Sequence, residues 1–205
     1  MRVSAISECE VRQPLRNLSR IDAGYQSRGR IEPAARGTHW LLQVGDIDER
    51  RECVRAEDLV RFSPGRSAGN AVVSRGDVLF MAKGSAHFAL ALPELPVPTL
   101  AAGYFFIVRV TSSTLLPEYV AWYLNQDVPQ RYFRQQAGQG VNMPVVRIGV
   151  LGECEVPVPP LATQRRIVEL DALRREEEHL LVRLTEKRRL LLGGACLRAI
   201  EQEPR

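Results

Sequence analysis

Short apolar runs separated by Gly, Pro and Asp make up residues 6 to about 158. Runs of this length that are rich in Val, Phe and Tyr are typical of β-strands. Turn residues border them, since Gly-Asp pairs stand at residues 45–46 and 76–77. The pattern therefore predicts a sheet whose clearest strands cover residues 39–44, 77–81 and 104–110.

Two short helices are predicted after the last of these strands. In residues 116–125, Pro117 and Glu118 open a helix, and one face at helical spacing is apolar: Val120, Tyr123 and Leu124. We expect this face to pack on the sheet. A second helix is expected over residues 128–136, followed by the Gly-rich loop 137–142.

The composition changes at residues 156–160, where three prolines in four positions stop any strand. The next 32 residues, 161–192, contain no Gly or Pro. They predict a single helix about 48 Å long at ~1.5 Å per residue. Gly193-Gly194 is expected to end this helix.

The long helix carries a stripe of leucines whose positions step alternately by three and four residues: Leu170, Leu173, Leu180, Leu184 and Leu191. This spacing is typical of a coiled-coil helix that pairs with another helix. Glu177 and Lys187 interrupt the stripe. Charges at such positions set register or partner choice, although a helix packed only on its own domain would also tolerate them.

The length of 205 residues, with 45% hydrophobic and 25% charged side chains, fits one soluble domain plus an appendage. The expected fold is mixed α/β (α+β). A twisted-sheet domain over residues 1–160 is followed by the long coiled-coil helix in residues 161–205.

The net charge of +4 allows a nucleic-acid partner without demanding one. The four cysteines and three histidines are scattered and form no CxxC pair, so neither a metal site nor a disulfide framework is indicated. No run approaches the roughly 20 apolar residues of a membrane span. We therefore expect a cytoplasmic protein with no membrane contact.

Enzyme motifs are missing from the sequence, including nucleotide-binding glycine loops, HExxH and GxSxG. Asp46, Asp48 and Asp77 stand at strand ends, where an acidic pair could serve acid–base chemistry. Gly-Asp turns are the more common explanation for such residues. We expect no catalytic residue in the chain.

Three polar loops, at residues 23–30, 82–87 and 134–142, carry side chains suited to DNA. Arginine and lysine bind phosphates, while amides and arginine bind base edges. Exposed polar loops are also normal in any domain. The candidate DNA-binding residues are Tyr25, Arg28, Arg30, Lys83, Ser85, His87, Gln139 and Asn142.

Residues 151–168, LGECEVPVPPLATQRRIV, closely resemble the junction found in specificity (S) subunits of type I restriction-modification systems. In that family a strand ending in PxPPL is followed by xxQxxIV and a long helix. The family usually has Glu just before the Gln, whereas this chain has Thr163.

Other segments resemble the family in the same order along the chain. Residues 44–47 are similar to its early xxDI strand, and residues 75–80 with Lys83-Gly84 are similar to its GDIL…KG segment. Residues 116–125 resemble LxPxYLxxYLN, and residues 138–142 take the place of a Gly-containing turn. The resemblance covers nearly the whole chain.

The resemblance implies a non-catalytic target-recognition domain that binds double-stranded DNA, followed by a spacer helix. DNA methyltransferase and restriction/translocase subunits would dock on it. No cofactor is implied in this chain, because S-adenosylmethionine is bound by the methyltransferase subunit. An ordinary S subunit has two recognition domains and two helices, whereas this chain has one of each. We therefore expect a homodimer that reads a bipartite palindromic target, with the helix setting the half-site separation.

Two alternatives remain open. The chain could be half of a heterodimeric specificity subunit, or a silent recognition cassette, with Glu177 and Lys187 marking a helix specific for a different partner. It could also be a coiled-coil adaptor that binds protein alone.

Overall fold

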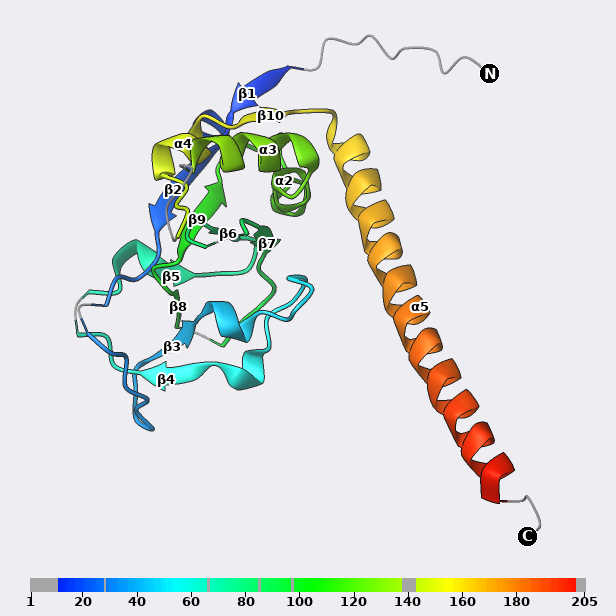
Figure 1. The fold of residues 1–205 in the computed structure, drawn as a ribbon. Helices are drawn as coiled ribbons and strands as arrows, with labels where there is room; N and C mark the ends of the chain where they lie inside the picture. Colours follow the sequence, from blue (N-terminus) through cyan, green and yellow to red (C-terminus); the bar gives the residue numbers. More distant parts are fainter. Residues whose placement is uncertain are drawn as a thin grey trace, which may run out of the picture. The chain divides into compact units, whose positions relative to one another are not determined.

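The computed structural model describes residues 11–27, 29–65, 67–84, 86–96, 98–137 and 143–201, with side chains described as far as Arg198. The chain divides into two compact units, one ending at Arg165 and the other beginning at Arg166 (Figure 1). The first unit is mixed α/β, and the second consists of the long helix. The expected fold class is confirmed.

Two four-stranded sheets form the first unit. One is antiparallel, with the strand order β2 (Ser19–Ala23), β9 (Phe105–Val110), β6 (Val78–Met81), β7 (Ala89–Ala91). The other has the order β4 (Val60–Phe62), β3 (His39–Leu42), β8 (Thr99–Ala101), β5 (Val72–Val73), and its β3–β8 pair is parallel. A separate antiparallel pair joins β1 (Arg12–Pro14) to β10 (Glu155–Pro157).

The helices and 3-10 turns complete the unit. The helices are α1 (Leu15–Leu18), α2 (Pro117–Leu124), α3 (Asp127–Gln136) and α4 (Ile148–Gly152), and the turns are η1 (Val44–Asp46), η2 (Ala56–Asp58) and η3 (Gly69–Ala71). Figure 1 shows α2, α3 and α4 on one side of β6 and β9, with β3 and β4 on the other side. The second unit is the rest of α5 (Leu161–Glu201).

One apolar cluster joins the two four-stranded sheets. It includes Leu41 and Leu100 from the mixed sheet and Leu79, Phe105 and Ile107 from the antiparallel sheet, all fully buried. Burial of such side chains is the main source of folding free energy. The two sheets therefore form one folding unit.

Helix α2 packs on β6 and β7 as predicted, with Val120 and Leu124 fully buried. Pro117 occupies its first turn, where the missing N–H costs nothing. The Tyr119 hydroxyl donates to the Pro157 carbonyl at 3.1 Å. The predicted face is confirmed, and α2 is also tied to β10.

Two predicted boundaries were wrong. Helix α5 continues through Gly193-Gly194 to Glu201, because glycine inside a helix costs only about 1 kcal/mol and does not break it as proline does. Strand β3 ends at Leu42, and residues 44–46 turn into η1. There the Asp46 carboxylate accepts a hydrogen bond from the Gln43 amide at 2.7 Å and closes the turn.

Among the helices of the described ranges, none is long and apolar enough to cross a membrane.

Candidate nucleic-acid interface

The turn between β8 and β9, residues 102–104, is the meeting point of two of the predicted loops. Tyr25 forms a parallel bridge with Ala102, and the Gln26 Nε2 donates to the Gly103 carbonyl at 3.2 Å. From the other side, the Ala82 amide donates to the Tyr104 carbonyl at 2.9 Å. Gln26 and Gly103 are 77 residues apart in the sequence, and these hydrogen bonds make their loops neighbours in the fold.

Lys83 joins the third segment to this group. It forms an antiparallel bridge with Val145, three residues after the Gly-rich loop ends at residue 142. The Gly84 amide donates to the Pro144 carbonyl at 3.0 Å, and the Val146 amide donates to the Ala82 carbonyl at 2.9 Å. The structure therefore brings the Lys83 loop and the segment after the Gly-rich loop side by side.

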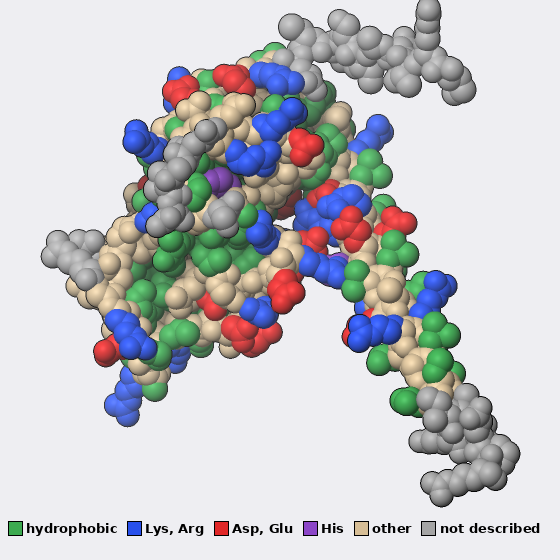
Figure 2. Space-filling model, viewed as in Figure 1, with side chains coloured by type: hydrophobic (Ala, Val, Ile, Leu, Met, Phe, Trp, Pro, Cys, Tyr) green, Lys and Arg blue, Asp and Glu red, His purple; other side chains and the backbone are tan. Residues whose placement is uncertain are grey.

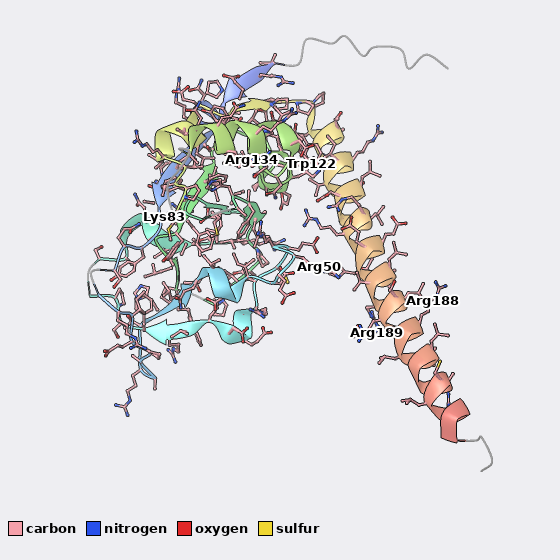
Figure 3. All side chains as sticks on the ribbon, viewed as in Figure 1. Arg50, Lys83, Trp122, Arg134, Arg188 and Arg189 are labelled. Carbon is pink, nitrogen blue, oxygen red and sulfur yellow. The ribbon has the colours of Figure 1, made fainter. Side chains whose placement is uncertain are left out.

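An aromatic side chain accompanies Lys83 at this edge of the unit. The Lys83 Nζ lies 5.9 Å from the centroid of the Tyr104 ring, within range of a cation–π contact. Tyr104 is 47% exposed and Lys83 is half-buried. Figure 3 labels Lys83 on the ribbon. A cationic side chain can bind a phosphate, and an exposed aromatic ring beside it can stack on a base.

The other predicted DNA-binding residues have different environments. Tyr25 is buried, and its ring packs edge-on against Phe62 with the centroids 5.7 Å apart. His87 is also buried, stacked on Phe80 with its Nδ1 3.0 Å from the Met81 carbonyl oxygen. These positions favour roles in holding the loops. Arg30 is exposed, and the remaining predictions lie outside the described residues: Arg28, Ser85, Gln139 and Asn142.

A cleft of about 460 Å³ adjoins the first loop, with walls from residues 25, 27, 29–34, 62, 63 and 65. Arg30 and Glu32 line it together with Ser27 and the ring of Phe62. The Ser27 hydroxyl donates to the Gly29 carbonyl at 2.6 Å, which shapes this part of the loop. The cleft is therefore lined by charged side chains of both signs together with an aromatic side chain.

The acidic residues at strand ends support turns. Asp48 Oδ1 accepts hydrogen bonds from the amides of Glu52 at 2.7 Å and Cys53 at 2.8 Å. Burial alone would raise the pKa of Asp48, but these amides and that of Arg50 outweigh it and hold the pKa below its ordinary value. For Asp46 burial dominates and raises the pKa. This geometry favours the turn explanation over acid–base chemistry.

Asp77 belongs to a structural ion-pair group. Its carboxylate accepts from the Ser74 amide at 3.0 Å and lies 3.4 Å from the Arg109 guanidinium. Arg109 also pairs with Asp22 at 2.6 Å. Buried and partly buried charges need partners, and here each of the three has one.

Thiol and metal chemistry are the remaining possibilities to consider among the described residues. Burial raises the pKa of the Cys154 thiol to about 12, so it stays protonated at neutral pH. Within the described ranges, no group of three or more His, Cys, Asp or Glu side chains could hold a metal ion.

For two residues the structure gives a role that the sequence did not. Tyr104 was placed inside a strand, whereas it lies in the exposed turn before β9. Gln164 is fully buried, and its amide donates to the carbonyls of Thr114 at 2.8 Å and Pro159 at 2.7 Å while accepting from the Leu116 amide at 2.9 Å. The resemblance marked this Gln, but only the structure gives its partners.

The leucine stripe of α5 is open to solvent. The exposed fractions of its five leucines, in chain order, are 66%, 67%, 51%, 45% and 69%. The space-filling view shows apolar side chains repeating along the helix (Figure 2). An exposed apolar stripe of this length is typical of a helix that pairs with another.

The sequence matches no protein-family model and none of the curated proteins. Solved structures do resemble it. The HsdS subunit from Thermoanaerobacter tengcongensis aligns with a TM-score of 0.58 at 17% identity, over 86% of this chain and 40% of that one. The chain has the fold of a type I restriction-modification S subunit.

Two further structures share this HsdS fold. A chain from a study of complex assembly and conformational transition of the type I R-M system aligns at 18% identity with a TM-score of 0.58, covering 98% of this chain and 46% of that one. The type I S subunit from M. genitalium aligns at 13% identity with a TM-score of 0.54, covering 93% and 45%. The chain thus spans less than half the length of these neighbours.

Proposed function

We propose that this chain is a DNA-specificity subunit of a type I restriction-modification complex. The observation that carries the proposal is its HsdS fold, with a mixed α/β unit followed directly by a long helix. The PxPPL…Q junction supports the same conclusion, because Gln164 of this junction binds the first turn of α5 to the backbone of residues 114–116 and 159.

The first unit binds double-stranded DNA in this proposal. The loops that meet at residues 102–104 supply the contacts, with Lys83 and Arg30 joined by the other predicted residues: Arg28, Ser85, Gln139 and Asn142. Cations position the protein on phosphates, while amides and arginines contact base edges. Tyr25 and His87 support these loops from inside the unit.

Catalysis belongs to the partners of the chain. A methyltransferase subunit, carrying S-adenosylmethionine, and a restriction subunit dock on the complex and act at the site that this chain selects. The chain itself has no catalytic role, in keeping with its strand-end carboxylates, which accept backbone hydrogen bonds in turns.

Each chain reads one half-site. The chain covers 40–46% of the HsdS structures that it resembles, and its exposed leucine stripe suits pairing with a second copy. A two-fold pair of identical readers selects a palindromic, bipartite target, because the symmetry of the protein is mirrored in the DNA.

Methylome sequencing of the host with and without this gene tests the proposal. We expect one bipartite palindromic motif to lose its methylation when the gene is deleted. Loss of a bipartite motif with two different halves would favour a heterodimer. An unchanged methylome would overturn DNA recognition and favour a protein-binding adaptor.

The DNA contacts are tested with the variants Arg28→Ala and Lys83→Ala in the complex with the methyltransferase subunit. Each removed phosphate contact should weaken DNA binding and reduce the slope of log K against log salt by about 0.9. Arg131→Ala is the matched control, since Arg131 is an exposed arginine on α3 that contacts its own helix. Wild-type binding by both variants at two salt concentrations would contradict the assignment.

A further inference from the structure

Exposed apolar side chains concentrate at one edge of the first unit. Among the described residues of that unit, six large hydrophobic side chains are exposed, and four of them belong to the β8–β9 turn or to residues 143–148. These four are Tyr104 at 47%, Met143 at 47%, Val145 at 38% and Ile148 at 43%. Single exposed hydrophobic residues are normal on a protein surface, whereas a group of them marks an interaction site.

Lys83 joins Tyr104 to Val145. Lys83 and Val145 are partners in an antiparallel bridge, and the side chains of such partners lie on the same face with their Cβ atoms about 4.5–5.5 Å apart. The Lys83 Nζ also lies 5.9 Å from the centroid of the Tyr104 ring. The Ala82 amide donates to the Tyr104 carbonyl, and the Ala82 carbonyl accepts from the Val146 amide, both at 2.9 Å. The backbone therefore holds Tyr104, Lys83 and Val145 together, and we call these three residues the Tyr104 edge.

The segments that build the Tyr104 edge carry positive charge only. Residues 82–87, 101–106 and 143–152 contain no Asp or Glu, but they contain Lys83 and Arg147. Arg147 is exposed and Lys83 is half-buried. DNA presents negative phosphates beside the edges of its bases. An apolar surface with cations and without carboxylates in its segments therefore complements a DNA groove.

We propose that the Tyr104 edge reads one thymine of the half-site in the major groove, with the Tyr104 ring and Val145 packed against the 5-methyl group of the base. The Lys83 ammonium binds a phosphate beside that base. The inference rests on the proposed DNA recognition and adds one base of the target and the residues that select it.

Thymine is the base whose chemistry matches this surface. Its 5-methyl group is the apolar contact point of the major groove, where the other groups that identify a base are hydrogen-bond donors and acceptors. Val145 and the face of the Tyr104 ring satisfy neither kind of group. A different base at this position would have a donor or acceptor shielded from water without a partner, which is unfavourable. The Tyr104 edge therefore both favours thymine and disfavours the other bases.

Deoxyuridine substitution tests the inference, because deoxyuridine pairs with adenine as thymidine does but lacks the 5-methyl group. The probe is a duplex carrying the motif identified by methylome sequencing, bound to the full-length chain in complex with the methyltransferase subunit. Each thymine of one half-site, on either strand, is replaced in turn. Burial of one methyl group corresponds to about a fourfold difference in affinity. We expect one position at which deoxyuridine weakens binding by about this factor.

Variants assign that position to the Tyr104 edge. Val145→Ala and Tyr104→Ala should each bring the ratio of the thymine and deoxyuridine affinities from about four towards one, because the contact with the methyl group is lost. Tyr104→Phe keeps the ring and should keep the ratio. Val128→Ala is the matched control, since Val128 is a valine of α3 that is 57% exposed, and it should also keep the ratio. Each ratio compares two duplexes with one protein preparation, so a reduced amount of folded protein leaves it unchanged.

The outcomes distinguish the inference from the proposed function. A complex that binds the motif duplex no better than a scrambled duplex would overturn the proposed DNA recognition. Specific binding that no deoxyuridine weakens, or a wild-type ratio in both alanine variants, would overturn only the reading of thymine by the Tyr104 edge. A half-site without thymine would do the same. Failure of both alanine variants to assemble with the methyltransferase subunit would identify the edge as a protein-docking surface instead.

Discussion

At the scale of single residues, Gly24 decides how closely the loop of residues 23–30 approaches the β8–β9 turn. A Cβ atom at this position would lie 2.2 Å from the Ala102 carbonyl oxygen and 2.9 Å from that of Ala101. Both atoms belong to the backbone, and the Tyr25 amide donates to the same Ala101 carbonyl at 2.7 Å. No side-chain rotation could relieve the clash, so the loop would have to move.

We expect Gly24→Ala to lower the free energy of unfolding by about 1–3 kcal/mol, because overpacking forces the backbone to shift. Chemical denaturation measures the loss. Gly29→Ala is the control in the same loop, since a Cβ there meets nothing within 4 Å, and its effect should stay within about 0.5 kcal/mol. An unfolding midpoint of Gly24→Ala equal to that of Gly29→Ala would show that the approach is looser than described.

Asp48 makes a pH-dependent contribution to the free energy of unfolding. Its carboxylate accepts three backbone amides, which stabilise the ionised form and hold its pKa below the unfolded value of about 3.9. The stabilisation is therefore complete above that unfolded pKa and disappears as the pH falls through the lower folded pKa. Asp48→Ala should cost about 1–2 kcal/mol at neutral pH.

Urea unfolding at several pH values measures this effect. The difference between wild type and Asp48→Ala should shrink as the pH falls below the unfolded pKa. Glu49→Ala, at an exposed neighbouring position, should show no such trend. A difference that is constant across pH would mean that the charge of Asp48 contributes nothing.

At the scale of elements, the first turn of α5, which lies inside the first unit, depends on Gln164. Its side chain occupies the first turn of the helix and binds three backbone groups, two of them in residues 114–116 just before α2. The prolines before it keep the chain extended until α5 begins. Thr163, which departs from the family pattern, is exposed, whereas the neighbouring Gln164 is buried.

We expect Gln164→Ala to destabilise the first unit by about 2–3 kcal/mol, because buried backbone groups would lose their partners. Gln164→Glu should be damaging as well, since a carboxylate cannot donate to the Thr114 and Pro159 carbonyls. Thermal unfolding compares both with Gln135→Ala, at an exposed position of α3. Equal unfolding midpoints for the position 164 variants and this control would contradict the stabilising role of Gln164.

The sequence predicted elements better than contacts. Helix α2 follows from Pro117 and an apolar face, and β6 and β9 follow from local apolar runs, because periodicity records which side of an element is buried. The prediction that the helix ends at Gly193-Gly194 was wrong, because glycine permits a helix as well as a turn. Burial of Tyr25 and His87 could not be foreseen, since an aromatic ring in a polar loop can point either way.

The contacts of the candidate interface were also beyond what the sequence could predict. The three polar loops were recognisable from composition, but their spatial relation was not. The meeting of the first two loops at residues 102–104 depends on long-range pairings such as Tyr25 with Ala102, and the approach of the segment after the third loop depends on the pairing of Lys83 with Val145. Such pairings leave no periodic signal in either segment. The role of Tyr104 beside Lys83 could therefore be found only from the fold.

At the scale of the whole molecule, the two units draw stability from different sources. The first unit has its own apolar core. Helix α5 instead exposes its leucines, and an isolated helix gains little stability from propensity alone. Its folding should therefore depend on the partner helix, and so on the concentration of the chain.

Two spectroscopic signals separate these transitions. Both tryptophans, Trp40 and Trp122, belong to the first unit, so their fluorescence reports only that unit. Far-UV circular dichroism follows the helices, of which α5 is the longest described. We expect a dichroism transition whose midpoint rises with chain concentration and a fluorescence transition whose midpoint does not.

Leu184→Asn should lower the concentration-dependent midpoint, because a polar amide replaces a leucine at the centre of the stripe, and it should leave the fluorescence midpoint unchanged. Leu190→Asn is the control, since Leu190 is equally helical and 68% exposed but is turned about 100° from Leu191 on the helix. Equal effects of the two variants would mean that helix propensity, and not pairing along the stripe, stabilises α5. A fall in the fluorescence midpoint with Leu184→Asn would mean that the two units unfold together.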